Sequence, residues 1–290
     1  MKLSVIIPTF RDWQRLSLCL HALEQQSWSK NDFEVIVANN DPADHAPDDL
    51  CNDLTIQVQV IEAHQKGSYA ARNAGAAIAS GQILCFTDAD CVPSVDWLTN
   101  IARHFAESDS CQLLLSGDVV MFSEHHPDYQ YNFAESYDFF FGISQKDYAA
   151  RQVACTANLS MHREVFDSVG GYDGRLFSGG DVEFCSRAVK AGALFQFDQS
   201  CFVKHPLRHT FKSLLVKSRR VIGARIQRQG YIKSIGTLMP PLYRIVKIAQ
   251  VDTVPWGLRL KGMASTFVIK AAQISEYVSL LLKLKKAENR

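Results

Sequence analysis

Strand patterns alternate with helical patterns over the first ninety residues, and this alternation constrains the fold more than any other feature. Apolar runs rich in β-branched residues occur at four places, residues 3–8, 33–40, 55–63 and 83–87. Residues 12–26 and 68–80 lie between these runs and have helical spacing. Strands that alternate with helices form a parallel sheet with helices on both faces. The sequence therefore predicts an α/β fold with a mostly parallel, doubly wound sheet, in which ligands bind beyond the carboxyl ends of the strands.

The pattern is less regular after the fourth strand. Residues 111–122 and 153–162 are typical of strands, and an aromatic-rich segment at 129–142 separates them. A further helix is expected to begin at Asp181 and to end at Gly192, because glycine commonly follows the last helical turn.

The length and composition are those of a soluble globular protein with a full hydrophobic core. The chain has 290 residues, of which 47% are apolar and 21% are charged. It contains no run of 18 apolar residues, and its N-terminal apolar segment is too short for a signal peptide. The eight cysteines form no C-x-x-C pair, so we expect buried, reduced thiols and no zinc site. These features predict a cytoplasmic protein.

The net charge of +1 conceals an asymmetry along the chain. Residues 1–205 carry 14 basic and 27 acidic residues, whereas residues 206–290 carry 17 basic and 3 acidic residues. We therefore predict a first domain at 1–207 and a basic, mainly helical C-terminal extension at 208–290. Two alternatives remain for the extension: peripheral attachment to the anionic inner face of the cell membrane, or docking on the acidic first domain. Nucleic-acid binding is the weaker option, and we predict none.

The segment ILCFTDAD at residues 83–90 ends a buried strand in two carboxylates, Asp88 and Asp90. Residues i and i+2 on an extended backbone point to the same side, so the two carboxylates converge. Close carboxylates repel one another unless one is protonated or a cation lies between them. Hard oxygen ligands favour Mg²⁺ or Mn²⁺, and Mg²⁺ commonly contacts substrate phosphates as well. The pair indicates a divalent-cation site for a phosphate-bearing ligand, and the alternative is a solvated turn with two acids.

Other candidate site residues lie just before this strand or later in the chain. Lys66, Arg72 and Asn73 precede the strand, and the guanidinium of Arg72 suits either a diphosphate or a surface salt bridge. Asp181 stands at a predicted helix N-terminus, where it is either a cap or a general base. His205 is a ligand, a general acid or a structural histidine.

Four segments, taken in their order along the chain, carry specific sequence motifs. They are SVIIPTF near the N-terminus, EVIVANND at the second strand, GSYAARNAGAAIASGQILCFTDADCVPSVDWL in the centre, and FSGGDVEFCSRAVKAGA. Together they resemble family 2 glycosyltransferases with the GT-A fold, over about residues 1–210. The resemblance implies inverting transfer of a sugar from a nucleotide-diphosphate sugar to the hydroxyl of a carbohydrate or lipid-linked acceptor. Polysaccharide or glycolipid biosynthesis is the expected setting.

The resemblance also places residues at the nucleotide sugar. They are Pro8, Thr9 and Phe10 after the first strand, Asn39, Asn40 and Asp41 after the second, and Arg72, Asn73 and Asp88. We add Lys66 to this group because of its position. The family commonly has an aspartate where this chain has Asn39 and Asn40, and the adjacent Asp41 is the candidate substitute.

The remaining roles concern the cation and the reaction. Three residues match the cation site, Asp88, Asp90 and His205. Asp181 matches the catalytic base of the family's E-D motif, but Gly180 replaces the glutamate, so that an acid pair would need Glu183 as its auxiliary member. In the implied mechanism Asp181 takes the proton of the attacking hydroxyl, and one displacement inverts the anomeric configuration.

Other classes fit the sequence less well. A sugar-phosphate nucleotidylyltransferase needs a glycine-rich phosphate loop where this chain has PTFRDW, and a dehydrogenase needs G-x-G-x-x-G. A degenerate glycosyltransferase that only binds or scaffolds a partner stays open because of Asn39 and Gly180. The retained carboxylates Asp88, Asp90 and Asp181 argue against it.

Overall fold

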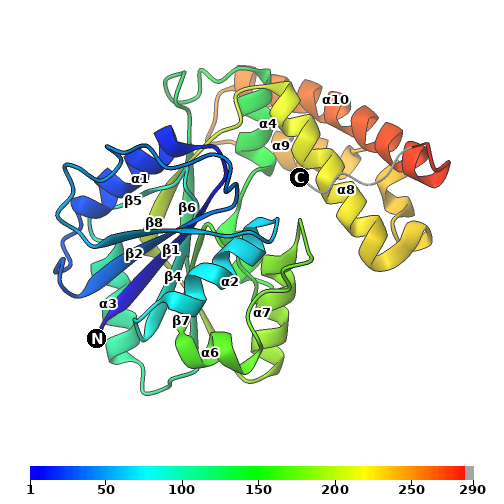
Figure 1. Cartoon of the computed structure of the whole chain (residues 1–290). Coiled ribbons are helices and arrows are strands. Elements are labelled where there is room, and N and C mark those ends of the chain that lie inside the picture. The colour runs from blue at the N-terminus through cyan, green and yellow to red at the C-terminus, as the bar shows by residue number, and fades with distance from the viewer. Residues whose placement is uncertain (285–290) are drawn as a thin grey trace. The chain divides into compact units, whose positions relative to one another are not determined.

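The computed structural model describes residues 1–284 and divides into two compact units (Figure 1). Unit 1 contains residues 1–120, 144–176 and 180–205. Unit 2 contains residues 121–143 and 177–179 and begins its last segment at Pro206. The chain therefore passes between the units more than once, and the predicted boundary at residue 207 lies beside its last passage.

Within residues 1–284, eight strands form one sheet in the order β3-β2-β1-β4-β7-β6-β8-β5. The strands are β1 (Leu3–Thr9), β2 (Phe33–Asn39), β3 (Val58–Glu62), β4 (Ile83–Thr87), β5 (Val92–Pro93), β6 (Leu113–Phe122), β7 (Asn158–His162) and β8 (Leu194–Pro206). β1 to β4 pair in parallel, with Val5 opposite both Val35 and Cys85. The pairs β4–β7, β6–β7 and β5–β8 are antiparallel.

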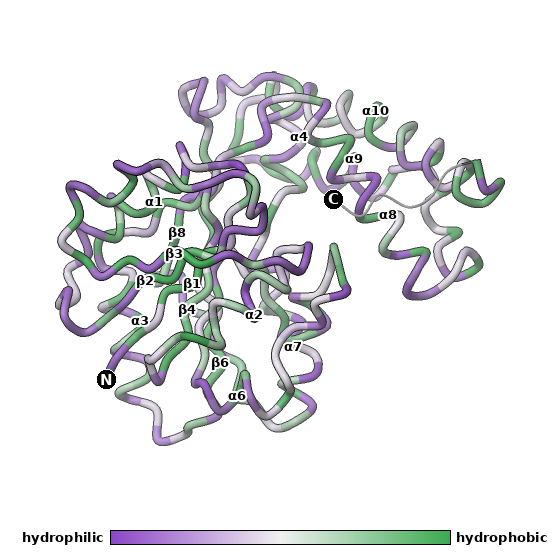
Figure 2. The backbone as a smooth tube through the Cα atoms, in the orientation of Figure 1, coloured by the Kyte–Doolittle hydropathy of each residue, from purple (hydrophilic) through white to green (hydrophobic). Residues whose placement is uncertain are grey.

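The central parallel strands are buried on both faces, which explains their nearly continuous apolar sequences. Figure 2 shows this apolar centre as green segments among more polar loops. β3 lies at the edge of the sheet and is partly exposed, and it carries the polar residues Gln59 and Glu62 among its apolar ones. The predicted α/β architecture with its doubly wound parallel sheet is confirmed, and β1 lies between β2 and β4 at the point where the strand order reverses.

Helices cover both faces of this sheet. Those of unit 1 are α1 (Trp13–Glu24), α2 (Ser68–Ile78), α3 (Trp97–Glu107), α5 (Gln145–Ala149), α6 (Arg163–Ser168) and α7 (Gly180–Lys190). In Figure 1, α1 and α3 lie on one side of the strands, and α2, α6 and α7 lie on the other. The close approach of α2 depends on Gly75, where a Cβ atom would lie 2.7 Å from Ile6.

Unit 2 is helical. It contains α4 (Phe133–Phe141), α8 (Phe211–Lys233), a 3-10 helix (Ile235–Leu238), α9 (Leu242–Ala249) and α10 (Trp256–Leu281). Asn132 and Glu135 form a capping box at the start of α4, which lies inside the aromatic-rich segment. Leu214 of α8 and Ile269 of α10 pack with Tyr137 of α4. Among the described residues, no helix has the length and apolar character needed to cross a membrane.

Two sequence-based element boundaries need correction. Of the strand expected at 153–162, only Asn158–His162 is extended in the sheet. The amide of Gln145 hydrogen-bonds the backbone of Cys155 and Asn158, and so satisfies polar groups that a ladder would otherwise use. Helix α7 begins at Gly180 rather than at Asp181 and ends at Lys190, two residues before Gly192.

A buried carboxylate fastens the end of α1 to the segment before β3. Glu24 accepts hydrogen bonds from the backbone N–H groups of Thr55 and Ile56 at 2.9 and 3.1 Å, and it also binds Lys30. Burial raises the pKa of Glu24, but the hydrogen bonds from Lys30 and Thr55 outweigh this effect and lower it to about 2. The folded state therefore favours the ionised carboxylate.

We predict that Glu24→Gln lowers the free energy of unfolding at pH 7 by about 1–2 kcal/mol, because buried N–H groups lose a charged acceptor. Because the pKa of Glu24 is lower in the folded state, its ionised carboxylate stabilises the fold at pH values above the unfolded pKa, near 4.5. This stabilisation is lost as the pH falls towards 2. Urea unfolding at pH 7, 4 and 3 should therefore show a shrinking difference between wild type and variant. Glu107→Gln, at an exposed position, is the control and should have little effect. A difference that stays constant to pH 3 would contradict this account.

Candidate active site

Two aspartates and a histidine meet just beyond the carboxyl end of β4. Asp88 and Asp90 follow Thr87, and β5 pairs antiparallel with β8 so that Val92 lies opposite Lys204. This register brings His205 beside Asp90, with 3.6 Å between the imidazole Nε2 and the carboxylate Oδ1. One ligand atom from each of Asp88, Asp90 and His205 lies within 4.8 Å of the others. His205 is buried, whereas both carboxylates are partly open to solvent.

A chain of polar contacts runs from this cluster to Asp181. Arg72 of α2 forms an ion pair with Oδ1 of Asp88. The guanidinium of Arg72 lies 5.7 Å from the ring centroid of Tyr69, one helical turn earlier. The hydroxyl of Tyr69 donates a hydrogen bond to Oδ1 of Asp181 at 3.2 Å. The two ends of the site are thus connected through neighbouring side chains of one helix.

Burial and neighbouring charges together set the protonation states of Arg72 and Tyr69. Arg72 is only 3% exposed, and this desolvation lowers its pKa; the charge of Asp88, together with weaker electrostatic contributions from neighbouring side chains, outweighs the effect, so the pKa is raised on balance and the guanidinium stays charged. Burial raises the pKa of Tyr69, and the negative charge of Asp181 raises it further. Tyr69 therefore keeps its proton and remains a hydrogen-bond donor to Asp181.

Gly180 and Tyr69 occupy complementary space. A Cβ atom at Gly180 would lie 2.6 Å from the Tyr69 ring, which no real contact tolerates. The aromatic ring thus fills the place beside Gly180 where a side chain at that position would begin. Sequence reasoning missed Tyr69. The available signal was its spacing of three residues from Arg72, which puts both side chains on one face of α2.

The predicted nucleotide-binding residues at the carboxyl ends of β1 and β2 are close together, with Thr9 opposite Asn39, but several side chains already bind backbone groups. Asn39 is buried and donates hydrogen bonds to the carbonyls of Asp41 and Asp44. The amide nitrogen of Asn40 donates to the carbonyls of Ala63 and Gln65, and its oxygen accepts from the N–H of Gly67.

The other residues of this group differ in exposure. Thr9 is buried, Pro8 is half-buried, and Phe10 is exposed with the guanidinium of Arg11 5.4 Å from its ring centroid. The carboxylate of Asp41 forms an ion pair with Arg11 at 2.5 Å.

For three further candidate residues, no contact with the carboxylates of Asp88 and Asp90 is seen in the described part of the chain. Asn73 binds both the N–H and the carbonyl of Tyr172, at 2.9 and 2.7 Å, and thereby fixes the loop after α6. Glu183 forms a two-pronged ion pair with Arg187, with both distances 2.8 Å. Lys66 is exposed in the loop before α2. The functional roles of these residues stay predictions.

The comparisons with known proteins identify the family of this chain. Residues 4–170, more than half of the chain, match the family described as Glycosyl transferase family 2. Glycosyltransferase AglE of Haloferax volcanii is 35% identical over 228 residues, which cover 77% of this chain and 73% of AglE. The chain belongs to glycosyl transferase family 2. This glycosyltransferase carries Asp88 and Asp90 inside the matched segment, whereas Asp181 and His205 lie beyond it.

Solved structures show the fold of this family member. The mannosyltransferase PcManGT from Pyrobaculum calidifontis, in complex with GDP-Man and Mn²⁺, has a TM-score of 0.59 and 16% identity. That likeness covers 98% of this chain and 88% of PcManGT. Residues 1–349 of S. aureus TarS, in complex with UDP-GlcNAc, have a TM-score of 0.55 and 14% identity over 96% of this chain and 89% of that one. The family 2 chain has the GT-A fold that its sequence predicts.

We predict that Gly180→Ala displaces Tyr69 and lowers the transferase kcat by about tenfold or more, because the hydrogen bond to Asp181 is broken. Assays of kcat and thermal unfolding should compare it with Gly257→Ala, where a Cβ atom meets nothing within 4 Å. Combining Gly180→Ala with Tyr69→Ala should cost less stability than the sum of the two single changes, because the clash is absent once the ring is removed. Wild-type kcat in Gly180→Ala would contradict the complementarity of these two residues.

Proposed function

We propose that this glycosyltransferase moves a sugar, with inversion, from a nucleotide-diphosphate sugar to an acceptor hydroxyl. The observation that carries the proposal is the chain Asp88–Arg72–Tyr69–Asp181 beyond the strand ends. It connects a carboxylate suited to a cation with a second carboxylate suited to a proton. The proposed cation ligand Asp88 and the proposed base Asp181 are therefore both held by the buried side chains of Arg72 and Tyr69.

The donor atoms of Asp88, Asp90 and His205 fit a divalent cation. Two carboxylates and one imidazole lie within 4.8 Å of one another, and oxygen-rich sites of this kind suit Mg²⁺ or Mn²⁺. When bound, the cation would neutralise the charge that develops on the leaving nucleotide diphosphate. The Mn²⁺ and GDP-Man of the PcManGT complex and the UDP-GlcNAc of the TarS complex support a nucleotide-sugar donor here.

Asp181 is the proposed base. Its position at the start of α7 leaves Oδ1 bound by the Tyr69 hydroxyl and by the N–H of Val182 at 2.9 Å. These bonds orient the carboxylate, and its other oxygen is the one that would take the acceptor proton. Direct attack of the activated hydroxyl on the anomeric carbon, in a single displacement, would invert the configuration at that carbon. Glu183 stays the proposed auxiliary acid beside Asp181, and its carboxylate forms an ion pair with Arg187.

We further propose a carbohydrate or lipid-linked acceptor, polysaccharide or glycolipid biosynthesis, and peripheral attachment to an anionic membrane face on the cytoplasmic side. Unit 2 supports attachment because large apolar side chains are exposed from the end of α8 through α9. They are Ile232, Ile235, Met239, Leu242, Tyr243 and Val246. Lys233 and Lys247 lie in the same stretch, and basic and apolar side chains together suit an anionic bilayer surface. In Figure 2 the neighbouring helix α10 likewise alternates between apolar and polar segments.

The competing proposal is a degenerate glycosyltransferase that only binds a partner. Asn39 and Gly180 favour it, since both depart from the family pattern. The two functions differ in whether a bound donor reacts, so hydrolysis of the donor by the full chain separates them even without a known acceptor.

We predict that Asp181→Asn lowers donor hydrolysis and sugar transfer by about 10²–10⁴-fold, because the general base is lost, while nucleotide binding stays unchanged. Asp109→Asn, an exposed position, is the control and should retain wild-type rates. Release of the nucleotide diphosphate is the measurement, with UDP- and GDP-sugars as donors. Equal, background-level release of the nucleotide diphosphate by wild type and Asp181→Asn would favour the degenerate glycosyltransferase that only binds a partner.

A further inference from the structure

Three histidines and one glutamate gather within unit 2, whereas the two aspartates after β4 belong to unit 1. His125 and His126 lie in the loop after β6, Glu135 lies in the first turn of α4, and His209 lies just before α8. One ligand atom from each of His126, Glu135 and His209 lies within 4.8 Å of the others. The ring centroids of His125 and His209 are 4.1 Å apart. We call these four residues the histidine cluster.

The carboxylate of Glu135 is the centre of the histidine cluster and is fully buried. Its Oε2 lies 2.8 Å from Nδ1 of His126, and its Oε1 lies 3.4 Å from Nδ1 of His209. Burial raises the pKa of Glu135, but the hydrogen bonds from Ser123 and from the N–H of Asn132, together with the neighbouring histidines, lower it on balance. The histidine cluster therefore presents an ionised carboxylate to two imidazoles.

One nitrogen of the histidine cluster lacks a hydrogen bond. Nδ1 of His126 is buried, and no hydrogen-bond partner is found for it among residues 1–284, although Oε2 of Glu135 lies only 2.8 Å away. The two atoms thus approach in a direction that does not suit an N–H···O bond. Buried polar atoms are normally paired, and a bound ion is one explanation of an exception. A cation that accepts a lone pair from both atoms would satisfy this nitrogen.

Hydrogen bonds hold the ligand-bearing segments in place. The hydroxyl of Ser123 donates to Oε1 of Glu135 and accepts from the backbone N–H of His126 at 3.0 Å. The side-chain amide of Asn132 donates to the carbonyl of His209 at 3.0 Å, and its nitrogen lies 3.0 Å from Nδ1 of the same residue. Metal sites commonly orient their ligands through such outer contacts.

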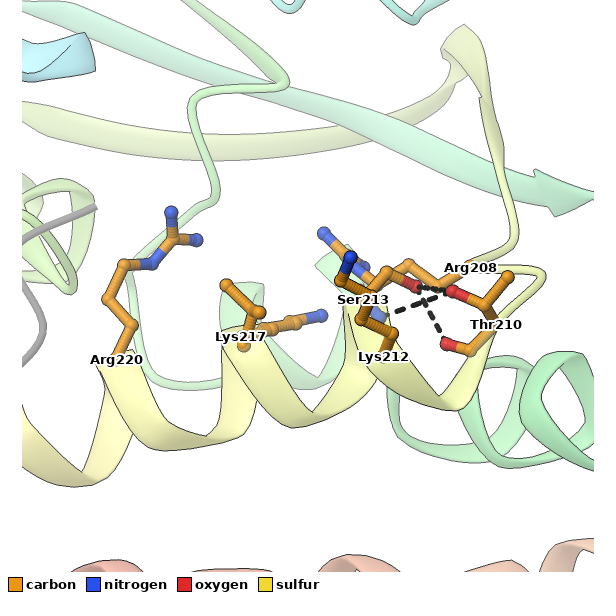
Figure 3. Close-up of a pocket in the computed structure, with 7 residues that line it drawn as sticks. Arg208, Thr210, Lys212, Ser213, Lys217 and Arg220 are labelled. Atoms are coloured by element: carbon orange, nitrogen blue, oxygen red, sulfur yellow. Dashed lines mark hydrogen bonds between the residues drawn. The ribbon is translucent and has the colours of Figure 1, made fainter.

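The residues on either side of His209 are also fixed. The backbone N–H of Arg208 donates to the carboxylate of Asp138 in α4 at 3.0 Å. Thr210 caps α8 by accepting a hydrogen bond from the N–H of Ser213 at 3.2 Å, and Figure 3 shows this first turn with Arg208 beside it. The side chain of His209 is 41% exposed. An ion can therefore reach a ligand whose backbone is already in position.

The donor atoms distinguish the histidine cluster from the two-aspartate site after β4. Two imidazoles with one carboxylate are a ligand set of Zn²⁺, whereas Mg²⁺ prefers oxygen ligands. His125 adds a third imidazole beside His209. Cysteine spacing could not indicate such a site, because its ligands are histidines and a glutamate from three separate segments.

We propose that the histidine cluster is a zinc site, with His126, Glu135 and His209 as ligands. The bound ion would join the loop after β6, helix α4 and the start of α8, and would thereby stabilise unit 2. This role is structural and separate from glycosyl transfer, so it does not depend on the proposed function.

The test is equilibrium dialysis of the full chain against Zn²⁺ in excess Mg²⁺, which competes for oxygen-rich sites, followed by elemental analysis of the retained metal. The cluster variant combines His126→Gln with His209→Gln. The matched control combines His45→Gln with His64→Gln and removes two exposed histidines outside the histidine cluster. Asp90→Ala tests whether the ion belongs to the carboxylates after β4.

We expect the wild type to retain one Zn²⁺ per chain more than the cluster variant, and the matched control and Asp90→Ala to retain as much as the wild type. Loss of an outer contact typically weakens metal binding 10–100-fold, so loss of two ligands should weaken it by about a hundredfold or more. Zn²⁺ should also raise the unfolding temperature of the wild type more than that of the cluster variant, and EDTA should reverse the rise.

The proposal is overturned if the wild type and the cluster variant retain equal amounts of Zn²⁺, or if the matched control loses as much as the cluster variant. It is also overturned if Asp90→Ala loses the ion. If the cluster variant does not fold, His209→Gln alone decides the question, because its side chain is partly exposed. That variant should bind Zn²⁺ about tenfold more weakly, and wild-type affinity would overturn the proposal.

Discussion

The ion pair between Arg72 and Asp88 is the interaction on which the rest of the site depends. A guanidinium that is 3% exposed has lost most of its hydration, and the carboxylate of Asp88, one of the two at the end of β4, compensates this buried charge. Arg72 in turn lies against Tyr69, whose hydroxyl holds Asp181. The ion pair therefore links the proposed cation site to the side chain that holds the proposed base.

The sequence predicts the part of this site that local patterns encode. Buried strands are recognisable because Val, Ile and Leu fill both faces, and Asp88 and Asp90 stand out because charge ends such a run. The contact between Tyr69 and Asp181 joins residues 112 positions apart, and no local pattern reports such a pairing. Gly180 was visible only as a departure from a motif; the structure gives its physical reason, which is the ring of Tyr69.

The charge asymmetry along the chain is a second feature that the sequence alone does not explain. Counted along the chain, the acids end and the basic residues begin near residue 206. In space, unit 2 also includes residues 121–143, and these supply the buried acids Glu135 and Asp138. Asp138 neutralises part of the basic excess of α8, which a linear count cannot show because the partners are about 70 residues apart.

The central claim is that the carboxylates after β4 form a cation-dependent nucleotide site. A thermal-shift panel of UDP, GDP, dTDP and CDP, each with and without Mn²⁺, tests it most directly, because a ligand that binds the folded state raises the unfolding temperature, and a tighter ligand raises it more. The account predicts a rise that requires both Mn²⁺ and one of the nucleotides and that disappears in Asp90→Ala. No Mn²⁺-dependent rise with any nucleotide, or a rise that persists in Asp90→Ala, would contradict it.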